Sequence, residues 1–272
     1  MKLLFLGDIV GKPGRTVVED NLPRLIDQLK IDFCVVNGEN AAHGFGITEK
    51  ICEGLFKAGV DAITLGNHAW DKSEIIPYIM DEPRLIRPDN YGAKYPGKGS
   101  GVFEARSGER VLVMNIMCRL FMELVDNPFD SLERLLPQGA PGDFGLDAVI
   151  VDMHGEASSE KYGIGHYSDG RASMVVGTHT HVPTADYHIL TGGTAYQTDA
   201  GMCGAYDSMI GMDKEAGLGR LLGQLPKSRL VPAEGEGTLC GSLVETDPKT
   251  GLAISIKAVR VGGKLSTAIP VA

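Results

Sequence analysis

Two histidines one residue apart follow an apolar run in this 272-residue chain. They lie in Gly177-Thr178-His179-Thr180-His181, directly after Met174-Val175-Val176. Neutral imidazole nitrogens are the commonest metal ligands in proteins near physiological pH. Because both rings leave the end of a predicted buried strand, they can bind one metal ion or two adjacent ions. On its own this pair would prove little, and the rest of the sequence decides whether it predicts a metal site.

Ligand-type residues follow four other apolar runs in the same way. They occur in Gly7-Asp8, Gly38-Glu39-Asn40, Gly66-Asn67-His68 and Asp152-Met153-His154, the last without a leading glycine. Because the carboxyl ends of strands in an α/β sheet open onto a shared crevice, we expect these side chains to meet there. The candidate metal ligands are Asp8, Glu39, Asn40, Asn67, His154, His179 and His181.

The chemistry of this set favours two catalytic metal ions. It offers carboxylate, carboxamide and imidazole donors but no cysteine, which argues against a closed structural zinc site and suits iron, manganese or open-site zinc. Seven candidates exceed the four ligands of a tetrahedral ion, so we expect two ions that share a carboxylate. Two such ions lower the pKa of a bridging water and so give hydroxide near neutral pH. They also neutralise the non-bridging oxygens of a bound phosphate ester, and the hydroxide attacks its phosphorus in line with the leaving oxygen.

A proton donor for the leaving oxygen lies next to one candidate ligand. His68 follows Asn67 directly and cannot share its coordination position, so we predict that His68 is the general acid. Asp71, three residues further on, is the candidate that orients the ring.

Short apolar runs that alternate with helical patterns indicate a parallel sheet in the first third of the chain. We expect strands over 3–6, 33–36 and 62–65. A helix is expected from about 13 to 30, and a second begins after the N-cap Thr48 and ends at Gly59. Ser73 is expected to cap a third helix.

Further along the chain the pattern changes to hairpins. Antiparallel hairpins are predicted for 102–105 with 111–116, 187–190 with 194–197, and 238–246 with 252–261, and buried strands for 148–151 and 173–176. These elements favour an α/β fold with either one mixed sheet or two facing sheets, and helices outside. We expect one domain over residues 1–272.

Composition restricts the classes of partner. Lys and Arg number 26 against 35 Asp and Glu, a formal charge of −9 without a basic stripe, so we expect no long nucleic acid as a partner. The five scattered cysteines favour reduced thiols. The first apolar run is too short for a signal peptide, and no run has the length of a membrane helix. We therefore expect a cytoplasmic protein without a membrane partner.

These motifs together resemble the calcineurin-like metallophosphoesterase superfamily. The segments Gly7-Asp8-Ile9-Val10-Gly11-Lys12-Pro13-Gly14-Arg15, Asn37-Gly38-Glu39-Asn40-Ala41-Ala42 and Gly66-Asn67-His68-Ala69-Trp70-Asp71 are similar to its bacterial YmdB-type branch. The resemblance runs from residue 1 to at least residue 204. It implies two facing mixed sheets flanked by helices, a dinuclear centre of iron or manganese, with iron expected first, and hydrolysis of cyclic nucleotides, notably 2′,3′-cyclic ones.

The resemblance also implies how the ligands are divided. Asp8, Glu39, Asn40 and His181 would hold one ion, and Glu39, Asn67, His154 and His179 the other, with Glu39 bridging and His68 donating the proton. The wider superfamily has D-x-H as its first motif and G-D as its second, whereas here Val10 and Glu39 stand at the histidine and aspartate positions. We therefore expect the Asp8-side ion to have more oxygen ligands, with Asn40 replacing an imidazole.

Several alternatives stay open at this point. His43, in the glycine-flanked loop 41–46, is a weak candidate for substrate binding and is equally consistent with a solvated loop residue. The unusual first motif is also consistent with a regulatory protein that binds metal or nucleotide without turnover. A mononuclear hydrolase acting on a non-phosphate bond is a third reading. A homo-oligomer is neither predicted nor excluded.

Overall fold

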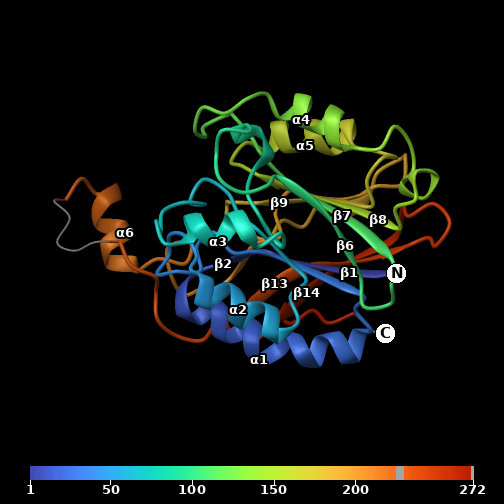
Figure 1. The fold of residues 1–272 in the computed structure, drawn as a ribbon. Helices are drawn as coiled ribbons and strands as arrows, with labels where there is room; N and C mark the ends of the chain where they lie inside the picture. Colours follow the sequence, from blue (N-terminus) through green and yellow to red (C-terminus); the bar gives the residue numbers. More distant parts are fainter. Residues whose placement is uncertain (225–229, 271–272) are drawn as a thin grey trace.

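Two six-stranded sheets face each other and helices cover their outer faces (Figure 1). This computed structural model describes residues 1–224 and 230–270. Of the two alternatives left open by the sequence, one mixed sheet or two facing sheets, the second is confirmed. No helix within the described residues is both long and apolar enough to cross a membrane.

The first sheet contains the opening parallel strands and the C-terminal hairpin. Its order is β14 (Ala253–Val261), β13 (Leu239–Thr246), β1 (Lys2–Leu6), β3 (Phe33–Asn37), β4 (Ala62–Thr64) and β5 (Leu85–Ile86). β1 is parallel to β3 but antiparallel to β13, with Leu3 opposite Val244. The predicted hairpin of the tail is therefore confirmed, and it completes the sheet on the free side of the first strand.

The second sheet is also mixed. Its order is β10 (His188–Ile189), β11 (Ala195–Gln197), β9 (Met174–Thr178), β8 (Ala148–His154), β7 (Arg110–Met117) and β6 (Ser100–Glu104). Both predicted hairpins, β6 with β7 and β10 with β11, are antiparallel as expected. The strands β7, β8, β9 and β11 between them are parallel.

Three apolar layers hold the sheets and helices together. Side chains of both sheets, including Phe5, Phe33, Ile150 and Val176, are fully buried between them. α1 (Gly11–Leu29), α2 (Glu49–Ala58) and α3 (Ile75–Asp81) pack on the outer face of the first sheet. α4 (Pro128–Leu135) and α5 (Ser158–Tyr167) pack on that of the second. The architecture is thus helix, sheet, sheet, helix.

The predicted helix ends are correct at α2 and wrong at α3. The Thr48 hydroxyl accepts a hydrogen bond from the Ile51 backbone N–H, and Gly59 takes the left-handed conformation that ends the helix. Ser73 does not cap α3, because the N-cap is Glu74, in helical conformation and without a side-chain hydrogen bond.

Several elements were not predicted. β2 (Asp8–Ile9) pairs in parallel with β12 (Met202–Cys203) in a small third sheet. β5, two short 3-10 helices (Asp89–Tyr91 and Pro141–Phe144), α4 and α6 (Lys214–Leu221) were also missed. α6 buries none of its residues and stands off the body of the protein in Figure 1. The five cysteines are free, as their spacing predicts, and all of them are buried.

Candidate metal centre

Every candidate metal ligand lies at or just beyond the carboxyl end of a strand. Asp8 follows β1, Glu39 and Asn40 follow β3, and Asn67 follows β4 in the first sheet. His154 ends β8, while His179 and His181 follow β9 in the second. The donors expected to meet therefore come from two sheets, each of which contributes part of the set.

Four donors converge tightly. Atoms of Glu39, His154 and His179 lie within 4.8 Å of one another, and this group is the one in the described residues with metal-ligand spacing. His154 Nε2 is 3.2 Å from Glu39 Oε1, 3.2 Å from His179 Nδ1 and 3.0 Å from Asn67 Oδ1. These four residues are the ones assigned to a single ion by the motif resemblance.

The remaining candidates form a looser group beside the first. His181 Nε2 is 3.9 Å from Asp8 Oδ1, and Asp8 accepts the His179 backbone N–H at 3.1 Å. The Asn40 side chain donates to the Gly44 carbonyl at 3.0 Å, but its Oδ1 is buried without a hydrogen-bond partner among the described residues. A buried oxygen without a partner is costly unless an ion or a water satisfies it. This atom therefore fits an oxygen ligand of a metal.

In His181 and His154 the ring nitrogen Nδ1 is engaged in a hydrogen bond, so Nε2 remains available to bind a metal. His181 Nδ1 lies 2.7 Å from the Ile210 carbonyl, which only accepts, so the ring proton is on Nδ1. His154 Nδ1 lies 2.9 Å from Thr178 Oγ1, which donates its own proton to Asp152 Oδ1 at 2.6 Å. Metal-binding histidines characteristically donate their other N–H to such partners.

Asp152 supports the ring of His154 through Thr178, a contact that its position in the sequence did not suggest. It is fully buried, and its other oxygen accepts from Thr64 Oγ1 at 2.5 Å and Asn37 Nδ2 at 3.0 Å. Burial raises the pKa of this carboxyl, opposed by His154 and by these hydrogen bonds. The available signal was a carboxylate two residues before His154 in the same apolar strand.

The charges of the cluster suit a cation. Burial alone would raise the pKa of Glu39, but His154 holds it at about 2, so Glu39 is ionised. Burial would lower the pKa of His154, but Glu39 raises it to about 9. The negative charge of Glu39 can thus be balanced either by a proton on His154 or by a metal ion bound at Nε2 of that ring. Burial and His154 lower the pKa of His179 to about 3, which leaves a neutral ring able to bind a metal.

The Asp8 carboxyl responds to its surroundings in the opposite way. Burial raises its pKa to about 7, with His181 and His154 opposing the shift. A fully buried carboxylate of this kind is normally paired or bound to a metal. The donor chemistry of both groups therefore fits a pair of metal ions.

Gly66 provides the space in which the ligands meet. A Cβ at this position would lie 2.3 Å from His154 Nε2 and 2.4 Å from Glu39 Oε2. We predict that Gly66→Ala displaces both donors and that the purified variant, reconstituted with manganese, loses at least one ion per chain by elemental analysis. In Gly54→Ala the nearest contact of the new Cβ is 3.2 Å away, so this control should keep its metal. A Gly66→Ala protein with wild-type metal content would contradict the assignment.

His68 is placed beside this cluster without belonging to it. Its backbone N–H donates to Glu39 Oε2 at 3.0 Å, and its ring Nδ1 is 2.8 Å from Asp71 Oδ2. The side chain is 26% exposed. With Nδ1 held by Asp71, Nε2 is free to exchange a proton with a bound molecule. The expected pairing of Asp71 with His68 is therefore present.

A buried ion pair that the sequence did not suggest supports the His179 segment. Lys161 and Asp199 are fully buried, with Nζ 2.9 Å from Oδ2. Nζ also donates to the Thr178 carbonyl at 2.8 Å, and Asp199 Oδ2 accepts the Thr180 N–H at 3.1 Å. The pair thus binds the peptide groups on both sides of His179, whose φ of +97° is rare for a residue other than glycine.

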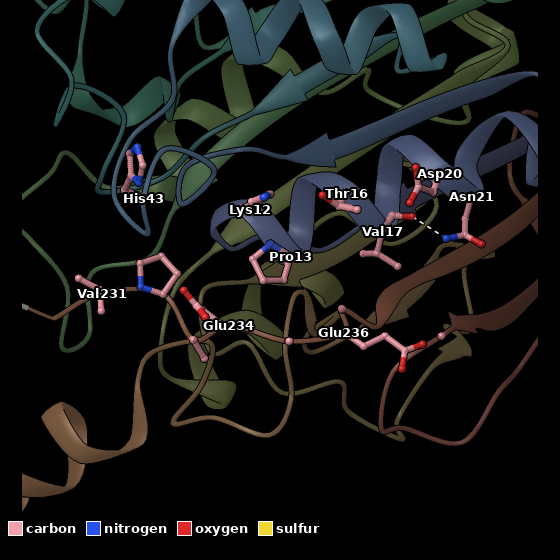
Figure 2. A pocket seen from close by; sticks show the side chains of 15 residues that line it. Lys12, Pro13, Thr16, Val17, Asp20, Asn21, His43, Val231, Glu234 and Glu236 are labelled. Carbon is pink, nitrogen blue, oxygen red and sulfur yellow. Dashed lines mark hydrogen bonds between the residues drawn. The ribbon is translucent and has the colours of Figure 1, made fainter.

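His43 is not placed with the other candidates. It is exposed and lines a separate pocket of about 950 Å³ between α1 and the segment 231–237, and the lining residues include none of the candidate metal ligands. Figure 2 shows His43 at one end of this pocket, with Lys12 and Thr16 on α1 and Glu234 and Glu236 on the other segment. The structure therefore gives no contact between His43 and the metal cluster, and its proposed role in substrate binding stays a prediction.

Known proteins match almost the whole chain. The model of the family described as YmdB-like protein matches residues 4–259. A 2′,3′-cyclic-nucleotide 2′-phosphodiesterase from Bacillus subtilis (strain 168) is 46% identical over 261 residues, 96% of this chain and 97% of that protein. A putative phosphatase/phosphodiesterase from Mycoplasma pneumoniae is 34% identical over 268 residues, 96% of this chain and 93% of that protein.

Solved structures share the fold. A hypothetical protein from Thermus thermophilus superposes with a TM-score of 0.88 at 40% identity, covering 97% of this chain and all (100%) of that one. A protein from Mycoplasma pneumoniae described as a novel phosphatase has a TM-score of 0.87 at 34% identity, covering 96% of this chain and 93% of that one.

Proposed function

This chain belongs to the YmdB-like protein family, and on that premise we propose that it hydrolyses 2′,3′-cyclic nucleotides with two metal ions. The observation that carries the proposal is the 46% identity, over 96% of this chain, to a Bacillus subtilis 2′,3′-cyclic-nucleotide 2′-phosphodiesterase. The convergence of Glu39, His154 and His179 supports the metal dependence.

The ligands of the proposed ions come from the two groups of donors. Glu39, Asn67, His154 and His179 would hold one ion. Asp8, Asn40 and His181, together with Glu39 as the bridge, would hold the other. Iron is our first expectation and manganese the second, since both accept mixed oxygen and nitrogen donors.

The residues divide the proposed reaction between them. When bound, the two ions would supply a water of lowered pKa and neutralise the charge of the phosphate. A water that has released one proton to solvent forms a bond from its oxygen to phosphorus, and the bond from phosphorus to the ribose 2′-oxygen breaks. His68 gives its Nε2 proton to that departing oxygen and is reprotonated from solvent, and the product is a nucleoside 3′-phosphate. Asp71 binds Nδ1 of the His68 ring and so orients the ring with Nε2 directed away from the Asp71 carboxylate.

A substrate panel tests the proposal. Protein reconstituted with iron or manganese should hydrolyse 2′,3′-cyclic AMP to adenosine 3′-phosphate. Chromatography would detect this product. The panel should include 3′,5′-cyclic AMP, linear phosphodiesters and phosphomonoesters. Absence of turnover across the whole panel, with two ions bound per chain, would reject the catalytic function in favour of a protein that binds metal or nucleotide without turnover.

Replacing His181 is expected to remove the Asp8-side ion and to leave the other ion bound. Because Val10 stands at the histidine position of the wider superfamily's first motif, His181 is the one imidazole assigned to the Asp8-side ion. We expect His181→Ala to reduce manganese from two ions to one per chain, measured by elemental analysis and by the loss of spin coupling in electron paramagnetic resonance. His166→Ala, an exposed histidine on α5, should retain both ions. Retention of both ions in His181→Ala would refute this ligand assignment.

A further inference from the structure

Three residues of the candidate metal centre and its surroundings have backbone conformations that are rare outside glycine. In the described residues the non-glycine positions with positive φ are Lys30, His43, Phe121, His179, His181 and Ile210. Lys30 is the left-handed cap that ends α1, a common role for such a residue. His179 and His181 are candidate ligands, and the Ile210 carbonyl is 2.7 Å from His181 Nδ1. Strained residues of this kind often mark functional sites.

Ile210 occupies a turn that disfavours its residue type. Met209 and Met212 exchange two backbone hydrogen bonds, of 2.9 Å and 3.0 Å, across a two-residue loop. Ile210 and Gly211 in that loop have φ of +46° and +93°, as in a type I′ hairpin turn. Its first position favours asparagine, aspartate or glycine, and a β-branched side chain there is a genuine outlier.

Packing explains the glycine of this turn but not the isoleucine. A Cβ on Gly211 would lie 2.7 Å from Val10 Cγ1, so the turn needs glycine there. The Ile210 side chain is 58% exposed and therefore gains little from burial. The contact with His181 uses the backbone carbonyl, which any residue would supply. The fold thus gives no reason for isoleucine at this position.

We propose that the Ile210 side chain is a substrate-specificity residue that packs against the nucleoside of the bound cyclic nucleotide. This inference rests on the proposed function, which puts the cyclic phosphate at the ions beside His181. The phosphate of a 2′,3′-cyclic nucleotide is fused to the ribose, so the nucleoside must lie next to the residues around the ions. An exposed apolar side chain held at His181 by its own backbone offers the apolar surface that nucleoside pockets use.

Ile210→Asn tests the side chain independently of the turn, because asparagine suits a type I′ turn and the backbone carbonyl of residue 210 is retained. We expect the variant to bind two ions, to have a melting temperature at or above that of the wild type, and to raise KM for 2′,3′-cyclic AMP about tenfold. The rate with ethylene phosphate, a cyclic phosphodiester without a nucleoside, should be unchanged. Lys30→Asn also introduces asparagine at an exposed left-handed position far from the ligands and should leave the kinetics on both substrates unaffected.

Calorimetric binding measurements in the His68→Ala protein distinguish the role of Ile210 in binding the nucleoside from the proposed hydrolytic function. Weaker binding of 2′,3′-cyclic AMP by the His68→Ala/Ile210→Asn protein supports the role of Ile210 even if the wild type hydrolyses nothing, a result that would reject the proposed function alone. Equal affinity with and without Ile210, or equal loss for ethylene phosphate and the nucleotide, would overturn the inference.

Discussion

Replacing His68 by alanine is expected to lower kcat for 2′,3′-cyclic AMP by about 10²–10⁴-fold while both metal ions stay bound. The ring has its Nδ1 at 2.8 Å from Asp71 and can present Nε2 to the leaving oxygen. The contact of this residue with the metal ligands is its backbone N–H, which donates to Glu39 Oε2 and is retained in the variant. Steady-state kinetics combined with elemental analysis would measure both halves of the expectation.

The leaving group provides the control for this role. Hydrolysis of a p-nitrophenyl phosphodiester releases p-nitrophenolate, a stable anion that needs little protonation, so His68→Ala should lose far less activity on this substrate than on the cyclic nucleotide. Asp71→Asn, which removes the charge that orients the ring, should cost about 10–100-fold on the cyclic nucleotide. Equal losses on both substrates would show that His68 does not act as the proton donor.

Lys161→Met is expected to lower the free energy of unfolding by about 3–5 kcal/mol, because it leaves Asp199 buried with an unpaired charge. Both side chains are fully buried, so water cannot compensate for the missing ammonium group. The same substitution removes the donor to the Thr178 carbonyl and loosens the backbone that presents His179. Urea denaturation measures the first effect, and manganese affinity at the His179 side measures the second.

Two further proteins make this prediction specific. The double variant Lys161→Met/Asp199→Asn removes both charges and should recover a large part of the lost stability. Lys214→Met breaks the pair with Asp207, whose two side chains are 57% and 68% exposed, and should leave stability almost unchanged because water screens the two charges. A loss in Lys161→Met no larger than that in Lys214→Met would contradict a structural role for the buried pair.

The sequence predicted the strands and the ligand candidates because both depend on local pattern. An apolar run followed by glycine and a polar residue identified Asp8, Glu39 and Asn67 without knowledge of which strands pair. It did not identify Asp152 as the partner of Thr178, or Lys161 as the partner of Asp199, since 26 and 38 residues separate the members of these pairs. The Ile210 carbonyl left no trace in the sequence, because a backbone acceptor is common to all residues.

The short elements were missed for a related reason. β2 and β12 have two residues each, and Asp8 pairs with Met202 from the far end of the chain. No run of such length carries a periodic signal. Helix α6 buries no residue, so it lacks the apolar face from which an amphipathic helix is recognised.

The position of β1 between β3 and β13 has a consequence for the order of synthesis. Every candidate ligand precedes residue 182, yet the second neighbour of the first strand is residues 239–246, which pair with residues 2–6. A growing chain that already contains all the ligands still exposes one edge of an apolar strand. Contacts between such distant residues slow folding. Completion of the sheet, and with it a stable place for Asp8, therefore waits until residues 239–246 have left the ribosome.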